Sequence, residues 1–196
     1  MSGRVKKSNS TRSKDSTHYE NIFEYNVNFK ERVVYLNSEI DEGSLEVIQK
    51  AFDEFETLPD KPIRIEISSY GGSVYDMFGI IDRIKSSPCK VITRGLGKIM
   101  SAATFILAAG DERSVGPNSW VMIHQASDSF RGKTDDINHD VHHHNNVQDQ
   151  MYELYERLSG KKISAKQWKK LCMKDHYIRA EEVLELGLVD HVTEED

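Results

Sequence analysis

Residues 95–103 read Gly95-Leu96-Gly97-Lys98-Ile99-Met100-Ser101-Ala102-Ala103, which sets a serine among glycines and alanines at the start of an apolar helical stretch. Residues 121–125 read Val121-Met122-Ile123-His124-Gln125, in which a histidine ends a run of strand-forming residues. A serine becomes a nucleophile when a nearby base takes its proton, and a neutral imidazole is the usual base near neutral pH. Ser101 and His124 are therefore the first candidates for a hydrolytic site.

A third polar residue and a glycine turn supply the remaining parts of such a site. Asp175 offers a carboxylate that would orient the imidazole, and Tyr70-Gly71-Gly72-Ser73 offers backbone N–H groups that no side chain shields. Each residue also has a structural interpretation, because a serine can cap a helix, a histidine can be buried in a core, and an aspartate can be a surface charge.

Around these motifs, β-branched runs alternate with segments of helical periodicity. The pattern predicts strands over residues 32–36, 63–67, 90–93, 114–115, 120–124 and 188–192. It predicts helices over residues 44–55, 74–84, 101–109, 134–158, 163–171 and 180–186. Strands that alternate with helices in this way indicate an α/β fold with a largely parallel sheet.

Length and composition limit the classes of function. A chain of 196 residues is long enough for one domain with a sizeable core. Its net charge of −6 argues against a nucleic-acid surface, and no apolar run suits a membrane span or a signal peptide. Its two cysteines, Cys89 and Cys172, are read as reduced thiols of a cytoplasmic protein. Residues 1–28 are basic and serine-rich, which is typical of a flexible segment, and residues 29–196 form the expected domain.

Several blocks occur in the order in which they occur in ClpP, the proteolytic subunit family of the Clp protease. They are Lys30–Leu36, Gly71–Asp76, Met100–Ala103, Leu107–Gly110, Pro117–Ser119, Met122–Gln125 and Asp175–Asp190. The stretch from about Phe29 to Val192 therefore resembles this family of serine peptidases. The resemblance implies the ClpP/crotonase-like fold, in which the helix over 134–158 is a projecting handle that meets its equivalent across two stacked rings.

The resemblance also assigns roles to individual residues. It implies that Ser101 is the nucleophile, that His124 is the base and that Asp175 orients His124. The oxyanion donors would be the backbone N–H groups of Gly72 and Ala102. The family commonly has a proline immediately before its two glycines, whereas this chain has Tyr70, a difference that bears on the stiffness of the loop and on the substrate groove.

Assembly and partners are likewise implied by the resemblance. Family members form seven-membered rings, usually stacked in pairs as a tetradecamer, that enclose the active sites and hydrolyse unfolded polypeptides. ATP is used by a separate AAA+ unfoldase such as ClpX or ClpA. The chain itself has no GxxxxGK[ST] phosphate loop, so we expect neither an ATPase activity nor a cofactor of its own.

Two other functions fit parts of the sequence. One is a ring-forming subunit that does not cut, which a serine-reactive probe would reveal by leaving Ser101 unlabelled. The other is an acyl-CoA enzyme of the crotonase type, which shares the general fold and the oxyanion hole and which binding of acyl-CoA would reveal. The combination of Ser101, His124 and Asp175 favours the peptidase over both.

The handle carries an unusual group of histidines, which are His139, His142, His143 and His144. His139 and His143 have the i, i+4 spacing of a zinc-binding HExxH helix, but Asp140 occupies the glutamate position. We therefore interpret the group as a solvated helix face and predict no metal site. Because imidazoles gain positive charge on acidification, we hypothesise that ring stacking through this handle weakens at mildly acidic pH, which sedimentation would test.

Overall fold

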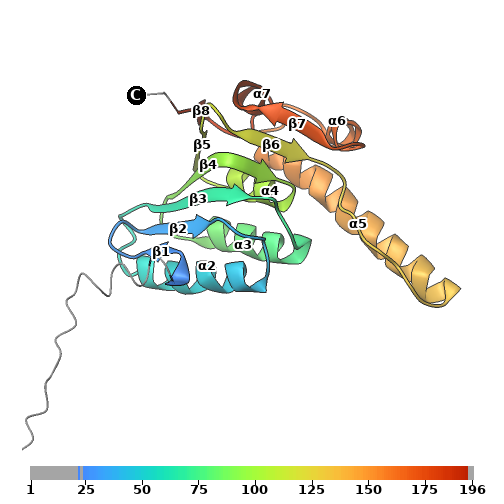
Figure 1. Cartoon of the computed structure of the whole chain (residues 1–196), viewed down its shortest axis with the longest axis horizontal. Helices are drawn as coiled ribbons and strands as arrows, with labels where there is room; N and C mark the ends of the chain where they lie inside the picture. Colours follow the sequence, from blue (N-terminus) through green and yellow to red (C-terminus); the bar gives the residue numbers. More distant parts are fainter. Residues whose placement is uncertain (1–21, 23, 194–196) are drawn as a thin grey trace, which may run out of the picture.

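The computed structural model describes residue 22 and residues 24–193 of the 196-residue chain. Most of the expected N-terminal segment, residues 1–28, lies outside the described residues. Within the described part, helices and strands alternate and build an eight-stranded sheet with helices packed against it (Figure 1).

The sheet is largely parallel, as the sequence predicts. Its strands are β1 (Val27–Asn28), β2 (Val33–Leu36), β3 (Ile63–Ser69), β4 (Val91–Met100), β5 (Glu112–Val115), β6 (Trp120–Ile123), β7 (His176–Arg179) and β8 (His191–Val192). The main path runs β1-β2-β3-β4-β5-β8, while β6 pairs with β4 and with β7. Only the pairs β1–β2 and β6–β7 are antiparallel among the pairs of described strands.

The helices lie close to their expected positions. They are α2 (Glu42–Phe55), α3 (Val74–Ser86), α4 (Ala102–Ala108), α5 (Thr134–Leu158), α6 (Ala165–Leu171) and α7 (Ala180–Glu185). A capping box starts α2, in which the Asp41 side chain accepts from the Ser44 N–H and the Ser44 hydroxyl accepts from the Asp41 N–H. Helix α5 has the bounds expected for the handle, and Figure 1 shows its N-terminal end projecting away from the sheet.

The core forms where apolar side chains of the strands meet apolar faces of the helices. Ile63, Ile65 and Ile67 alternate along β3 and are fully buried, as are Phe52 of α2 and Ile80 of α3. Complete burial of such a side chain stabilises the fold by about 1.5–3 kcal/mol. Near the C-terminal end of α5, the Tyr155 ring is stacked between Phe105 and Trp168, with centroid distances of 3.7 and 4.7 Å. This stack fixes the base of the handle to α4 and α6.

Three features of the sheet were not predicted. Strand β1 lies within residues 1–28, which were expected to be flexible, and it pairs with β2. Strand β4 continues through the glycine-containing residues 95–100, because these residues pair with β3 and then with β6. Strand β7 was not expected at all, and its antiparallel pairing with β6 adds an edge to the described sheet. Cys89 and Cys172 form no disulfide, as expected, and both are buried. Within the described residues, no helix combines the length and apolarity needed to cross a membrane.

Candidate active site

The parallel pairing of β4 and β6 brings Ser101 close to His124. Met100 is the Cα partner of Met122 at the end of this pairing, so the chain leaves both strands at the same edge of the sheet. Ser101 directly follows β4, and its N–H donates to the carbonyl of Met122 at 2.8 Å. His124 directly follows β6. The two residues therefore leave neighbouring strand ends, 23 positions apart in the sequence.

The antiparallel pairing of β6 and β7 brings Asp175 to the same place. Ile123 is the Cα partner of His176, and each earlier residue of β6 pairs with one residue later in β7. When the same register is continued by one residue beyond the pair Ile123–His176, His124 lies opposite Asp175. The unexpected strand β7 is thus the element that positions the third candidate residue.

The three side chains form one row, joined by a hydrogen bond between Ser101 and His124 and an ion-pair contact between His124 and Asp175. The Ser101 Oγ lies 2.8 Å from the His124 Nε2, and the His124 Nδ1 lies 3.4 Å from the Asp175 Oδ1. The His124 side chain is 25% exposed and that of Asp175 is 58% exposed. A serine, a base that contacts it and a carboxylate that contacts the base are the parts that activate a hydroxyl for attack.

Ser101 has an unusual backbone conformation. Its φ of 53° and ψ of −125° are rarely adopted by a residue with a side chain. Although Ser101 is the N-cap of α4, its side chain makes no capping hydrogen bond and contacts His124 instead. This sharp turn from strand to helix is comparable to the strained nucleophile turn of α/β-hydrolases.

The glycine turn packs directly against Ser101. Gly71 has a φ of +98°, and an added Cβ would lie 2.6 Å from the Met100 carbonyl oxygen. Gly72 forms a parallel bridge with Ile40, in which the Ile40 N–H donates to Gly71 O and the Ser73 N–H donates to Ile40 O. The bridge uses the residues on either side of Gly72, so the Gly72 N–H takes no part in it.

Ala102 is the first residue of α4, so its N–H has no partner within the helix. The Ala102 nitrogen lies 3.0 Å from the point where a Cβ added to Gly71 would lie. The glycine turn at residues 70–73 and the turn at Ser101 are therefore adjacent. The N–H groups of Gly72 and Ala102, the candidate oxyanion donors, thus come from two segments in contact with each other and with Ser101.

A cavity of about 530 Å³ opens beside Ser101. Besides Ser101 and His124, its walls include Gly72 and the side chains of Val74, Met122 and Met151. Apolar walls with a few polar groups are typical of a binding cleft. Tyr70 lines this cavity as well.

A hydrogen-bonded chain links the handle to the backbone of Ser101. The Thr104 hydroxyl donates to Ser101 O at 2.7 Å, and the Tyr155 hydroxyl lies 2.5 Å from the Thr104 Oγ1. Burial raises the pKa of Tyr155 well above its ordinary value, so the phenol stays protonated. This hydrogen-bonded chain is not predicted from the sequence. The only signals of it there are Thr104, next to Ala103, and Tyr155, at a core position of its helix.

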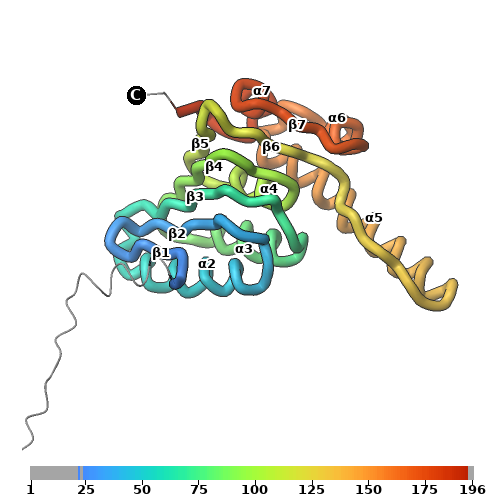
Figure 2. The backbone as a smooth tube through the Cα atoms, in the orientation of Figure 1, coloured from blue at the N-terminus to red at the C-terminus, as the bar shows by residue number. Residues whose placement is uncertain are grey.

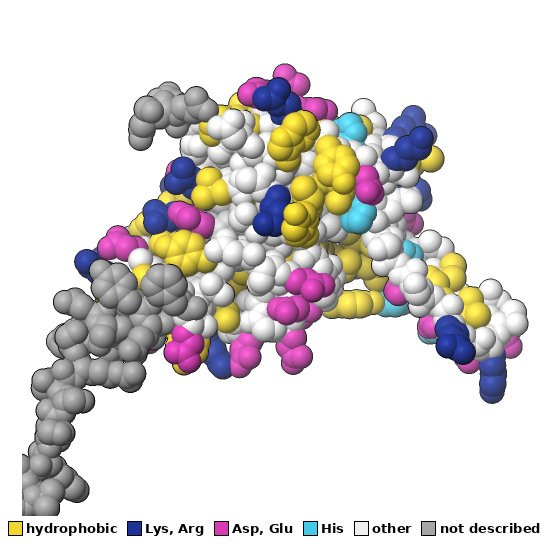
Figure 3. Space-filling view, viewed as in Figure 1, with side chains coloured by type: hydrophobic (Ala, Val, Ile, Leu, Met, Phe, Trp, Pro, Cys, Tyr) yellow, Lys and Arg dark blue, Asp and Glu magenta, His cyan; other side chains and the backbone are white. Residues whose placement is uncertain are grey.

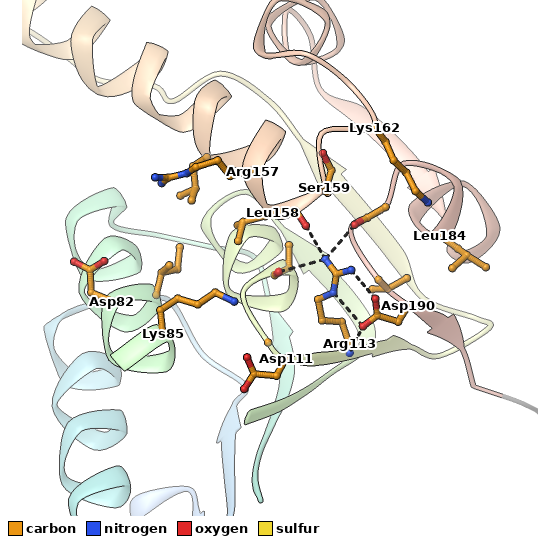
Figure 4. A pocket seen from close by; sticks show the side chains of 17 residues that line it. Asp82, Lys85, Asp111, Arg113, Arg157, Leu158, Ser159, Lys162, Leu184 and Asp190 are labelled. Carbon is orange, nitrogen blue, oxygen red and sulfur yellow. Dashed lines mark hydrogen bonds and ion pairs between the residues drawn. The ribbon is translucent and has the colours of Figure 1, made fainter. Parts of the chain in front are cut away.

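A larger cavity, about 950 Å³, lies away from Ser101, between α3, the C-terminal end of α5 and α7 (Figure 4). Arg113 dominates one wall, where its guanidinium forms an ion pair with Asp190 and donates to Leu158 O and Gly187 O. No histidine or cysteine is among its lining residues. Without a histidine among these residues, the cavity offers no imidazole base to activate Ser159, which also lines it.

Two histidines of the handle, His143 and His144, contact residues outside the helix. The Tyr75 hydroxyl lies 2.7 Å from the His143 Nε2, and the His144 ring packs edge-on against Phe130. Figure 2 shows why Phe130 is nearby, since the chain after β6 runs along α5 to its tip before it turns back into the helix. In the described part of the chain, no group of three or more histidine, cysteine or acidic residues is arranged to hold a metal ion.

Two comparisons with known proteins agree on one protein family. The family model described as Clp protease matches residues 15–196. The chain is also 32% identical over 169 residues to the ATP-dependent Clp protease proteolytic subunit of Porphyromonas gingivalis. That alignment covers 85% of this chain and 75% of the relative.

Proposed function

The chain belongs to the Clp protease family, and from this premise we propose that it is a serine endopeptidase that hydrolyses unfolded polypeptides inside an oligomeric chamber. The observation that supports the proposal most directly is the row of Ser101, His124 and Asp175, with contacts of 2.8 and 3.4 Å. The family match favours this activity over that of an acyl-CoA enzyme.

In the proposed reaction, the Ser101 Oγ attacks the carbonyl carbon of a substrate peptide bond while the His124 Nε2 takes the hydroxyl proton. Asp175 holds the imidazole in the tautomer whose Nε2 accepts and stabilises the imidazolium that forms. The proton then passes to the departing amine, the C–N bond breaks, and an ester to Ser101 remains. Water activated by His124 hydrolyses this ester and restores the hydroxyl.

The negative charge that develops on the substrate oxygen needs two donors. We assign them to the N–H groups of Gly72 and Ala102, which lie in adjacent turns beside Ser101. Removal of one such donor typically costs a factor of about 10²–10³ in rate. The absence of a Cβ at Gly72 lets a substrate carbonyl approach the backbone closely.

The substrate is proposed to bind as an added strand between the segment after Gly72 and the segment after His124. Both segments line the cavity beside Ser101. Main-chain pairing of this kind requires an extended chain and accepts many side chains. It therefore suits an enzyme that acts on unfolded polypeptides.

Assembly and energy supply complete the proposal. We expect heptameric rings stacked in pairs, with the projecting helix α5 meeting its equivalent in the opposite ring. The matched relative is named as a subunit of an ATP-dependent protease, and the present chain has no phosphate loop of the GxxxxGK[ST] type. A separate AAA+ unfoldase of the ClpX or ClpA type would therefore supply unfolded substrate.

The proposal is tested with a fluorophosphonate probe, which reacts with activated serines. We expect the full-length chain to be labelled at Ser101, identified by mass spectrometry, and to cleave an unstructured fluorogenic peptide. Ser101→Ala should lose both signals, whereas Ser86→Ala, which removes an exposed serine at the end of α3, should keep both. Unlabelled Ser101 in assembled rings would contradict the proposal and favour the subunit that does not cut.

A further inference from the structure

The row of candidate catalytic residues continues along the open face of β6 and β7. Side chains alternate between the two faces of a sheet, and directly paired residues share a face. Met122 pairs with Tyr177, and Trp120 pairs with Arg179, so these two pairs follow His124 and Asp175 in steps of two residues. The intervening residues Val121 and Ile178 are fully buried on the opposite, helix-covered face.

Strand β4 and the glycine turn widen this surface. Lys98 is the Cα partner of Trp120, and its ammonium lies 4.9 Å from the centre of the Tyr70 ring. The Arg179 guanidinium lies 6.0 Å from the centre of the Trp120 ring. We call the surface formed by these six side chains the aromatic–cationic strip; its members are Tyr70, Lys98, Trp120, Met122, Tyr177 and Arg179.

The aromatic members are open to solvent, although large aromatic rings are usually buried. Tyr70 is 70% exposed, Trp120 46% and Tyr177 53%. Figure 3 shows hydrophobic side chains gathered beside lysine, arginine and histidine side chains over this part of the sheet. A contiguous apolar patch bordered by polar groups is typical of a binding surface.

The two cations of the strip have aromatic neighbours but no carboxylate partner. Within the described residues, neither Lys98 nor Arg179 forms an ion pair, and each lies over an aromatic ring, that of Tyr70 or Trp120. The half-buried Arg83 and Arg113, in contrast, are matched by carboxylates. The strip therefore carries uncompensated positive charge in a chain whose net charge is −6.

The strip is continuous with the candidate active site. Tyr70, Lys98 and Met122 line the same cavity as Ser101 and His124. An extended chain that passes over Ser101 therefore meets the strip within a few residues of the bond to be cut.

We propose that the aromatic–cationic strip binds substrate segments that carry acidic and aromatic side chains close to the cleaved bond; this inference rests on the proposed peptidase function. Carboxylates would pair with Lys98 and Arg179, and aromatic rings would stack on the exposed rings of the strip. The strip thereby adds a side-chain preference to binding that otherwise depends on the main chain.

Binding is measured without cleavage in full-length Ser101→Ala protein. The chain has two tryptophans, of which Trp168 is fully buried, so a ligand on the strip should change mainly the fluorescence of Trp120. The probes are two unstructured peptides of equal length that share phenylalanines and carry either glutamates or lysines. We expect the glutamate peptide to bind at least about fivefold more tightly, with the difference shrinking as salt is added.

Two variants in the Ser101→Ala background show whether the strip causes this preference. Lys98→Gln combined with Arg179→Gln should bring the ratio of the two dissociation constants close to one. Lys61→Gln removes an exposed cation beyond the end of α2 and should leave the ratio unchanged. Equal binding of both peptides by the unaltered strip, or a preference that survives the double substitution, would overturn the proposal. So would sedimentation showing that the double substitution breaks the oligomer, because the strip would then be an interface between copies.

Fluorophosphonate labelling of unsubstituted protein is run in parallel. Labelling of Ser101 without a preference for the glutamate peptide would refute the proposed role of the strip and leave the proposed peptidase function standing. A peptide preference without labelling would refute the peptidase and leave the strip as a peptide-binding surface.

Discussion

A Cβ added to Gly71 would lie 2.7 Å from the Cβ of Ser101, closer than real Cβ contacts allow. The glycine turn and the nucleophile turn are thus packed against each other without room for one extra carbon atom. The backbone of Gly71 also has a φ of +98°, which residues with a side chain rarely adopt.

Gly71→Ala should therefore displace Ser101 from His124. We expect a decrease in the fluorophosphonate labelling rate of more than about tenfold, because a misplacement of about 1 Å can cost a factor of about 10². Gly160→Ala is the matched control, since Gly160 has a φ of +66° but no atom within 4 Å of the point where a Cβ would be added. Both variants bear the strain of a positive φ, so only a clash explains a difference in labelling; equal rates would contradict the prediction.

Asp175→Asn tests whether the contact between Asp175 and His124 matters for activity. An amide can stabilise the wrong tautomer of the imidazole and cannot balance the imidazolium charge, so peptide hydrolysis should fall by about 10³–10⁴. Stability should change little, because the Asp175 side chain is 58% exposed. The control is Asp149→Asn, which removes an exposed carboxylate of the handle that pairs with Lys169 of α6. A decrease of less than about tenfold would show that Asp175 does not serve His124.

Tyr155→Phe removes the last hydroxyl of the chain that leads to Ser101 O. Thr104 keeps its own acceptor, and the ring keeps its stacking between Phe105 and Trp168, so we expect a loss of about 1 kcal/mol in the free energy of unfolding. Tyr155→Ala, which also removes the buried ring, should cost about 3–5 kcal/mol. Urea unfolding of both variants measures the difference; equal losses would mean that the stacked ring contributes nothing.

The ion pair between Arg113 and Asp190 should make stability depend on pH. The hydrogen bond from Arg113 lowers the pKa of Asp190, so the pair stabilises the folded state above the ordinary aspartate pKa of about 3.9. The contribution is lost as the pH falls through the lowered pKa of the folded state. The Asp190 side chain is 43% exposed, which limits the expected gain to about 0.5–1 kcal/mol after solvent screening.

Asp190→Asn should accordingly lower the free energy of unfolding at neutral pH, and the difference from the unsubstituted chain should shrink towards a pH of about 3. Urea titrations at several pH values provide the measurement. Asp53→Asn, at a carboxylate that is 78% exposed beside Arg83, should have almost no effect at either pH. A difference that grows on acidification would contradict the assigned role of Arg113.

The sequence predicts the parallel sheet and most helices because their apolar periodicity is strong. It also predicts that His124 ends a strand and that Ser101 starts a helix, but not that β4 continues up to Ser101. Asp175 is assigned through the family resemblance alone, because the four residues of β7 contain a single buried side chain and give no clear alternation. The glycine-rich end of β4 has low strand propensity and contains Gly97 with a φ of 69°, so only its pairing with neighbouring strands identifies it as part of β4.

Other details of the site depend on the folded backbone. Two adjacent glycines in the sequence do not reveal that Gly71 packs against Ser101 while Gly72 forms the bridge with Ile40. Likewise, Tyr70 and Lys98 are 28 positions apart, and Trp120 and Arg179 are 59 positions apart. These pairs become neighbours only through the register of the strands, which local patterns do not specify.

The antiparallel pairing of β6 and β7 makes the whole row of candidate catalytic residues dependent on strand register. A slip by one residue would turn the side chains of β7 to the other face of the sheet, which would remove Asp175 from His124 and Arg179 from Trp120 in a single step. Both strands have only four residues, and β7 has no second neighbour within the described sheet. Local melting of this one short edge would therefore separate the candidate nucleophile Ser101 from its carboxylate partner and disrupt the aromatic–cationic strip together, while the main core stays folded.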